Sequence, residues 1–161
     1  MIRPARLDDA EVLARVHVRT WQAAYRHVFP PEQLDAVDAE RRVAGWRRML
    51  ASDMATFLDE TDGAVLGFVG VGASQDHAGI GELFMIYVLP DAWGTGLADG
   101  LIECGEDELR ARGFAEAVLS VLADNPRAER FYERHGWHRT DTYEGEFLGQ
   151  SVELAHHRKR L

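Results

Sequence analysis

A nearly continuous apolar run from Glu82 to Leu89 ends at Pro90, near the middle of the chain. A run without alternating polar residues is typical of a strand that is buried on both faces of a sheet. Gly94 and Gly96 follow this run, and a helical pattern then extends from Gly96 to Ala111. A buried strand, a tight turn and a helix in this order predict a central sheet with helices packed against it.

The remaining patterns predict one domain over residues 1–161, because no linker or repeat interrupts them. Asp8 and Glu11 have the spacing of a helix capping box, and Asp62-Gly63 favours a tight hairpin. The fold class is α+β, with a mixed, mostly antiparallel central sheet flanked by helices. Further helices are predicted over residues 9–27, 38–50 and 125–132, and further strands over residues 54–60, 64–73, 117–122, 137–143 and 147–155.

The charge balance disfavours nucleic acid and anionic membranes as partners. The chain has 18 Lys and Arg against 27 Asp and Glu, which gives a net charge of -9, opposite to the basic surface that phosphate backbones require. No apolar stretch has the length of a transmembrane helix or a signal peptide. The only cysteine, Cys104, can form no intrachain disulfide, and we expect a cytoplasmic protein.

No metal site is predicted, although the chain has seven histidines. His156 and His157 are neighbours on a predicted strand and face opposite ways, while His135 and His138 lie on either side of Gly136. The basic run from His156 to Arg160 is interpreted as a solvated terminus without a function.

The turn from Pro90 to Ala98 is the first candidate binding site. Glycines between a buried strand and a helix let the backbone approach an anion, and the free N–H groups at the helix start point at it. A Walker A loop is disfavoured because Gly-Lys-Ser/Thr is absent, and a dinucleotide fingerprint is disfavoured because Asp99 stands where glycine is needed. An anion site and a merely structural turn both remain open at this point.

A second motif follows, in which Asn-x-x-Ala-x-x-Phe-Tyr extends from Asn125 to Tyr132 and Gly136-Trp137 comes after it. Together with Pro-x-x-x-Gly-x-Gly-x-Ala from Pro90 to Ala98, it resembles the GNAT superfamily of acetyl-CoA-dependent N-acetyltransferases. The resemblance covers nearly the whole chain. It implies a GNAT-like acyl-CoA N-acyltransferase fold, with acetyl-CoA as co-substrate and no metal.

The resemblance also implies which residues contact the coenzyme. The family binds the pyrophosphate on loop amides, and the pantetheine arm on backbone groups of the central strand, here at Ile86 and Val88. Trp93 stands where the family usually has Arg or Gln, but its main-chain N–H is expected to remain available. The matching loop residues are Gly94, Thr95, Gly96, Leu97 and Ala98, whereas Asp99 is expected to point away. Asn125 is either a coenzyme contact or a helix N-cap, and the two roles are compatible.

For catalysis, the resemblance implies that Tyr132 is the general acid that protonates the departing thiolate; the alternative is core packing. Glu82 is either a general base acting through water or a solvated carboxylate at the strand end. The N–H of Val88 is the candidate for stabilising the oxyanion. Trp21 and Tyr25 either line the acceptor site or pack the first helix against the sheet.

These residues predict an N-acetyltransferase that acts on a primary amine of a small molecule or peptide by direct attack in a ternary complex. Cys104 lies within the helix after the turn and is badly placed for a nucleophile. The alternatives are a non-catalytic coenzyme A-binding sensing or regulatory module, and an acyltransferase for another acyl-CoA or a non-amine acceptor. The resemblance also allows a homodimer through the C-terminal strands, although no sequence pattern specifies an interface.

Overall fold

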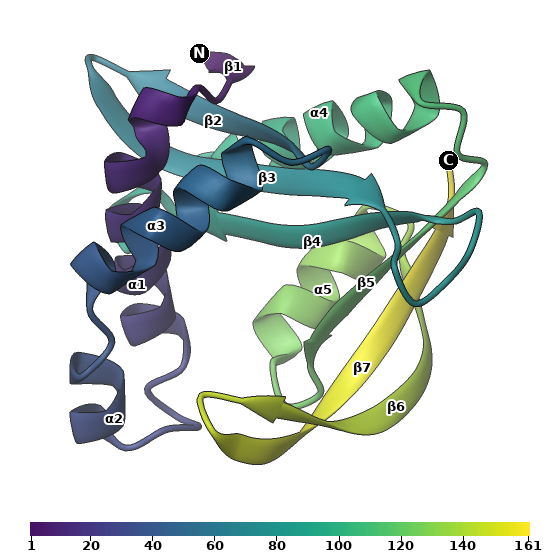
Figure 1. Ribbon diagram of the computed structural model, residues 1–161. Helices are drawn as coiled ribbons and strands as arrows, with labels where there is room; N and C mark the ends of the chain where they lie inside the picture. The colour runs from purple at the N-terminus through teal and green to yellow at the C-terminus, as the bar shows by residue number, and fades with distance from the viewer.

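Seven strands form one mixed sheet in the order β1-β2-β3-β4-β5-β7-β6 (Figure 1). The computed structural model describes residues 1–161. All neighbouring strands are antiparallel except the pair β4 and β5, so the predicted mixed, mostly antiparallel sheet is confirmed. The strands are β1 (Ile2–Pro4), β2 (Ala55–Thr61), β3 (Ala64–Ala73), β4 (Gly81–Val88), β5 (Glu116–Leu122), β6 (His138–Phe147) and β7 (Gln150–Arg160).

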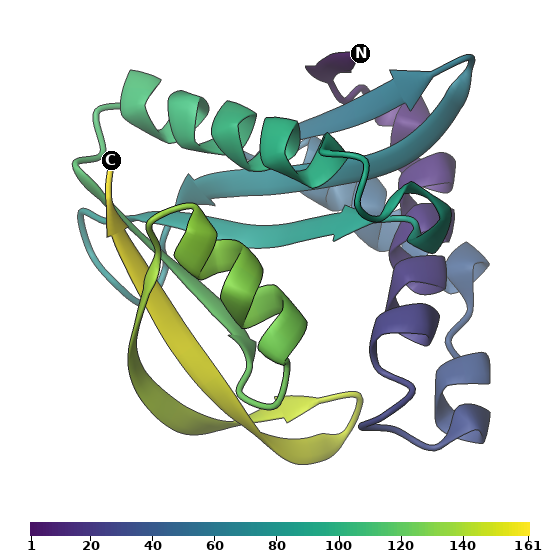
Figure 2. The same cartoon turned by 180° about the vertical axis from the view of Figure 1, so that it is seen from behind.

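Helices cover both faces of this sheet (Figures 1 and 2). Side chains alternate along β3, so that Val69 packs with α4 and α5, while Phe68 packs with α1 and α3 on the opposite face. The α-helices are α1 (Ala10–Ala24), α2 (Pro31–Asp35), α3 (Ala39–Leu50), α4 (Leu97–Ala111) and α5 (Pro126–Arg134), with short 3-10 turns at Leu7–Asp9 and Pro90–Ala92. No helix is both long enough and apolar enough to cross a membrane.

The predicted hairpin between β2 and β3 is confirmed. Asp62 and Gly63 have positive φ angles of 52° and 78°, which suit the tight turn that joins two antiparallel strands. The predicted helix over residues 38–50 is also confirmed as α3, whose N-cap Asp38 accepts a hydrogen bond from the N–H of Glu40.

The first helix differs from its prediction at both ends. Asp8 forms no capping bond; instead, the carboxylate of Asp9 accepts the N–H of Arg6 at 2.7 Å and pairs with the guanidinium of Arg3 at 2.8 Å. The helix ends at Ala24 rather than at residue 27. The prediction also missed α2, which begins at Pro31. This helix can form because proline is tolerated at the first helical position.

The C-terminal basic run was wrongly interpreted as a solvated terminus. It belongs to β7, which pairs with β5 from Leu154 to Arg160. His157 is buried on the side of α5, and Lys159 reaches the buried Glu106 at 2.6 Å. Strand alternation therefore directs part of this polar segment into the protein, where Glu106 also accepts a hydrogen bond from Trp137.

The strands β4 and β5 separate soon after they meet. They pair only at Gly81 with Ala117 and at Glu82 with Val118. Beyond these two residue pairs, β4 continues to Val88 beside β3 alone. This divergence leaves an opening in the middle of the sheet, next to the turn that precedes α4.

Candidate active site

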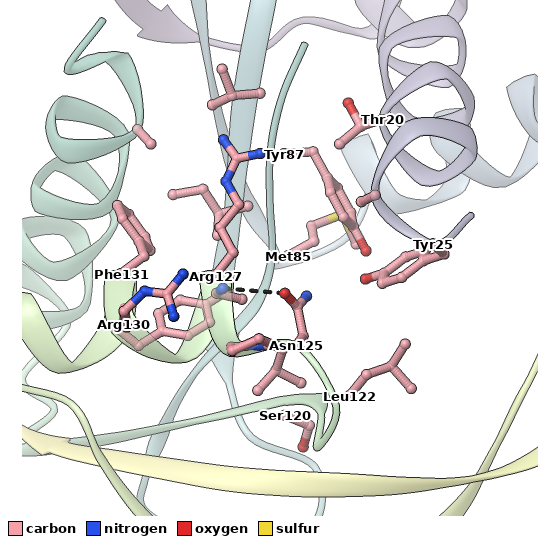
Figure 3. A pocket seen from close by; sticks show the side chains of 18 of the residues that line it. Thr20, Tyr25, Met85, Tyr87, Ser120, Leu122, Asn125, Arg127, Arg130 and Phe131 are labelled. Atoms are coloured by element: carbon pink, nitrogen blue, oxygen red, sulfur yellow. Dashed lines mark hydrogen bonds between the residues drawn. The ribbon is translucent and has the colours of Figure 1, made fainter. Parts of the chain in front are cut away.

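A cavity of about 730 Å³ lies where β4 and β5 separate, a size within the usual range of small-molecule sites. Its walls come from α1, β4, the turn before α4, β5, α5 and the hairpin of β6 and β7, and most of the side chains are hydrophobic (Figure 3). Elements that are distant in sequence thus meet around one space.

The register of β4 directs two of its backbone units into this opening. The N–H of Leu89 donates to the carbonyl of Leu66 on the β3 side, and residues of an antiparallel ladder alternate in the side to which they bond. Val88 and Ile86 therefore turn their backbone groups away from β3 and toward β5. Both residues line the cavity.

The glycine-rich turn offers free donors at the start of α4. The N–H groups of Gly94, Thr95 and Gly96 donate to no backbone carbonyl. Gly96, the N-cap, has a φ of 86°, which glycine adopts without strain. Leu97 and Ala98 open the helix, where N–H groups lack intrahelical partners. The arrangement suits an anion, and of these five residues Ala98 also lines the cavity.

The main-chain N–H of Trp93 was expected to be available to a ligand, but it is already hydrogen-bonded within the protein. Its N–H donates to the carbonyl of Pro90 at 3.1 Å, so this donor is engaged within the short turn and is not available to a ligand. The indole Nε1 donates to the carbonyl of Val88 at 2.7 Å. The side chain of Trp93 lines the cavity beside Arg127 of α5.

Asp99 was expected to point away from the glycine-rich turn, but its Oδ2 lies 3.7 Å from the place that a Cβ would take on Gly96. Its carboxylate pairs with Arg134 and His135 at the end of α5, both at 2.7 Å. These hydrogen bonds, that of Arg134 first, lower the pKa of Asp99. The negative charge next to the turn is therefore neutralised by α5.

Asn125 is the N-cap of α5, which is one of the two roles expected for it. Its Oδ1 accepts the N–H of Ala128 at 3.2 Å, and the residue also lines the cavity (Figure 3). The side-chain amide nitrogen has no protein partner. Asn125 thus holds the start of α5 and keeps one donor free at the cavity.

Three tyrosines, Tyr25, Tyr87 and Tyr132, contribute to the cavity from three elements. Burial raises the pKa of Tyr132, and the nearby Tyr87 adds to this effect. Burial is also the main cause of the raised pKa of Tyr25 and of Tyr87, whose hydroxyl groups lie next to each other in Figure 3. All three phenols therefore keep their protons at neutral pH.

Trp21 and Glu82, which were predicted for the acceptor site and for catalysis, also lie outside the cavity. Trp21 is buried and packs against Tyr25 and Phe147, so the packing interpretation describes it better than a contact with acceptor. Glu82 is half-buried at the one end of β4 that still pairs with β5, and it is not among the residues that line the cavity. The structure therefore does not bring Glu82 together with Tyr132.

Several cavity residues were missed by the sequence analysis, namely Tyr87, Asp124, Arg127 and Phe147. In the sequence, Tyr87 and Phe147 have no feature that distinguishes them from other strand residues. The register of β4 brings Tyr87 to the cavity, and the hairpin of β6 and β7 brings Phe147 there. Arg127 lies within the second motif at a variable position, so its contact with Trp93 has no sequence pattern. No group of three or more His, Cys, Asp or Glu side chains is arranged to hold a metal ion.

The sequence matches known acetyltransferases. A sequence model described as the acetyltransferase (GNAT) family matches residues 15–137. An uncharacterized N-acetyltransferase of Bacillus subtilis is 28% identical over 127 residues, which cover 78% of this chain and 73% of that protein. The mycothiol acetyltransferase of Rhodococcus jostii is 36% identical over 141 residues, which cover 84% of this chain but 44% of that enzyme. The chain thus spans less than half the length of that enzyme.

Solved structures of acetyltransferases share the fold. An N-acetyltransferase from Thermoplasma acidophilum, in complex with coenzyme A, has a TM-score of 0.79 and 20% identity, with 100% of this chain and 98% of that chain covered. A GCN5-related N-acetyltransferase from Rhodopseudomonas palustris has a TM-score of 0.82 and 23% identity, with 100% and 95% covered. The predicted GNAT-like fold is thereby confirmed.

Proposed function

Because the chain belongs to the acetyltransferase (GNAT) family and is an acyltransferase, we propose that it transfers the acetyl group of acetyl-CoA to a primary amine. The observation that carries this proposal is the cavity between β4 and β5, which has Tyr132 in its wall and lies next to the turn whose N–H groups at Gly94, Thr95 and Gly96 bond to no backbone carbonyl. In this proposal the donors at Gly94, Thr95 and Gly96 bind the pyrophosphate, with Leu97 and Ala98 at the helix start.

The pantetheine arm lies along β4 in this proposal. A strand that lacks a neighbour presents N–H and C=O groups to an extended ligand, as in the addition of a strand to a sheet edge. Ile86 has both groups to offer, whereas the carbonyl of Val88 already accepts the indole of Trp93. Asn125 adds its free amide from the opposite wall.

The reaction proceeds by direct attack. The neutral amine nitrogen attacks the thioester carbonyl, the new C–N bond forms and the C–S bond breaks. The nitrogen releases a proton to water, and solvent returns a proton to Tyr132 after it has protonated the sulfur. The N–H of Val88 is our candidate donor to the oxyanion that develops on the carbonyl oxygen. Tyr132 gives its proton to the departing sulfur. Its raised pKa keeps the phenol protonated before the reaction.

A covalent acetyl-enzyme is not part of this proposal. Cys104 lies within α4, half-buried and outside the cavity. Burial raises the pKa of its thiol, with further contributions from Asp107 and Glu108, so its reactive thiolate is disfavoured. Cys104→Ala is expected to keep full turnover, and a loss of turnover with intact coenzyme binding contradicts direct transfer.

The first experiment is a calorimetric titration with acetyl-CoA, with ATP and NAD as controls. We expect saturable binding of acetyl-CoA alone, followed by thiol release when a suitable amine is added. If acetyl-CoA does not bind, the assignments of the turn and of Tyr132 are withdrawn together.

A second candidate is a coenzyme A-binding module without turnover. It is favoured by one observation, namely that Trp93 uses both its main-chain N–H and its indole within the protein and so gives no hydrogen bond to the coenzyme. Binding of acetyl-CoA without thiol release, across a broad set of amines, supports this module and contradicts the transferase.

A further inference from the structure

The part of the cavity away from the glycine-rich turn is enclosed by apolar side chains. Phe147, at the end of β6, forms its aromatic base, with ring centroids 4.8 Å from Trp21 and 5.2 Å from Tyr25. Ala23, Ala24, Tyr25, Leu122 and Leu154 also line the cavity, and the polar lining residues of the same segments are Thr20, His27 and Ser120. Such a surface favours a carbon skeleton over a polar one, because it offers few partners for buried polar groups.

The hairpin that supplies Phe147 is held against α2 by side-chain hydrogen bonds. The side chain of Gln33 on α2 donates to the carbonyl of Leu148 at 2.7 Å, and Gln150 donates to Gln33 Oε1 at 2.8 Å. The turn between β6 and β7 is thereby tied to the segment after α1, and Figure 1 shows the two meeting. This tie leaves less room for a polypeptide that continues past Phe147 than for a small molecule.

The charged groups around the cavity can accept only one ammonium group. Asp124, which follows β5, is the only carboxylate residue among those that line the cavity. The other charged or titratable side chains there are those of His27, Arg127 and Arg130, besides the three protonated phenols. A second ammonium would lie near the exposed Arg127 and Arg130 without a carboxylate partner, and like charges repel each other.

We propose that the acetyl acceptor is a small primary monoamine with an apolar or aromatic carbon skeleton, which packs on Phe147 while Asp124 meets its ammonium form. This inference rests on the proposed transferase function and names the acceptor class for the same site. It separates this chain from enzymes that act on polyamines, amino sugars or protein lysines.

The test compares matched amines in a thiol-release assay with saturating acetyl-CoA. Hexylamine and 1,6-diaminohexane share a carbon chain and differ in the second ammonium, while 2-phenylethylamine and glucosamine differ in the polarity of the skeleton. We expect kcat/KM to be at least about 10-fold higher for hexylamine than for the diamine, and for 2-phenylethylamine than for glucosamine. A lysine-containing peptide is expected to be a poor acceptor.

Two variants connect this preference to the residues. Phe147→Ala is expected to lower kcat/KM for 2-phenylethylamine about 10-fold, because an aromatic surface of the site is removed. Leu148→Ala is the matched control, since Leu148 lies in the same turn but outside the cavity, and it should change this value less than about 3-fold. Asp124→Asn should raise the KM for hexylamine and leave the Kd for acetyl-CoA unchanged.

The outcomes separate the inference from the proposed function. If the diamine, glucosamine or the peptide is the better substrate, the acceptor class is wrong and the transferase stands. Equal losses in Phe147→Ala and Leu148→Ala also overturn the role of Phe147, because they indicate a damaged turn. If acetyl-CoA binds and none of these amines releases thiol, both the proposed function and the acceptor class are rejected.

Discussion

The guanidinium of Arg127 lies over the indole ring of Trp93, with its Cζ 3.6 Å from the ring centroid. Trp93 belongs to the turn before α4 and Arg127 to the start of α5, so this contact crosses the opening between β4 and β5. The GNAT family, which the sequence resembles, usually has Arg or Gln at the position of Trp93. Arg127 therefore brings a cation from α5 to a place where the turn itself lacks one.

Arg127→Ala is expected to raise the Kd for acetyl-CoA about 10-fold, which corresponds to roughly 1.4 kcal/mol. The variant removes both a positive charge near the phosphates and a cation–π contact worth about 0.5–2 kcal/mol. Calorimetry measures the change. Arg127→Lys keeps the charge and loses the planar stack, so it should have an intermediate Kd; an unchanged Kd in Arg127→Ala contradicts a coenzyme role for this residue.

Tyr132→Phe should lower kcat roughly 10²-fold and leave the Kd for acetyl-CoA nearly unchanged, because only the proton donor is lost. Tyr143→Phe is the matched control, since Tyr143 does not line the cavity, although its hydroxyl donates to Ser120, which does. Stopped assays of turnover and calorimetry of the same preparations give both values. A normal kcat in Tyr132→Phe rejects the general-acid assignment.

Glu82→Gln tests whether Glu82 is a general base, as the sequence suggests, or a carboxylate away from the reaction, as its place outside the cavity suggests. Because Glu82 does not line the cavity, the structure predicts that kcat changes less than about 3-fold, whereas removal of a general base costs roughly 10²-fold or more. The measurement is kcat as a function of pH. A large loss, together with the disappearance of the acidic limb of the profile, restores Glu82 as a base that acts through water.

His17 makes the stability of the fold depend on pH. Burial, with a contribution from Arg42, lowers its pKa from 6.5 to about 3, and both ring nitrogens lack hydrogen-bond partners. Below pH 6.5 the unfolded chain therefore binds a proton that the folded chain does not. The free energy of unfolding should fall as the pH decreases from 6.5 toward 3, by about 1.4 kcal/mol per pH unit.

Urea unfolding at pH 7 and pH 5 tests this dependence. Wild type should lose about 2 kcal/mol more between these pH values than His17→Leu does. Burial also lowers the pKa of His157, which contributes in the same direction and remains in the variant. Equal losses in both proteins would assign the acid sensitivity elsewhere.

The central part of the fold could be predicted from the sequence because local patterns determine it. The apolar run of β4, the glycines before α4 and the N-cap Asn125 each act within a few residues. The C-terminal strand could not be predicted in the same way. His157 and Lys159 are typical of a solvated segment, and only pairing with β5 and the buried Glu106 explains their place.

The candidate site shows the same division. Motif residues such as Tyr132 and Asn125 do line the cavity, because their positions follow from the start of α5. Phe147 reaches the cavity through a hairpin turn, and Trp93 loses its free N–H to a turn carbonyl. Both outcomes depend on tertiary geometry or on a single hydrogen bond, which a residue pattern does not encode.

Because only two residue pairs join β4 and β5, the sheet consists of two parts with little direct bonding between them. A substrate that fills the opening and contacts both parts acts as a cross-link, and its binding free energy adds to the free energy of unfolding. The protein is then most resistant to heat and proteases while its coenzyme is bound. In the proposed function, a higher concentration of acetyl-CoA therefore stabilises the fold as well as raising the rate.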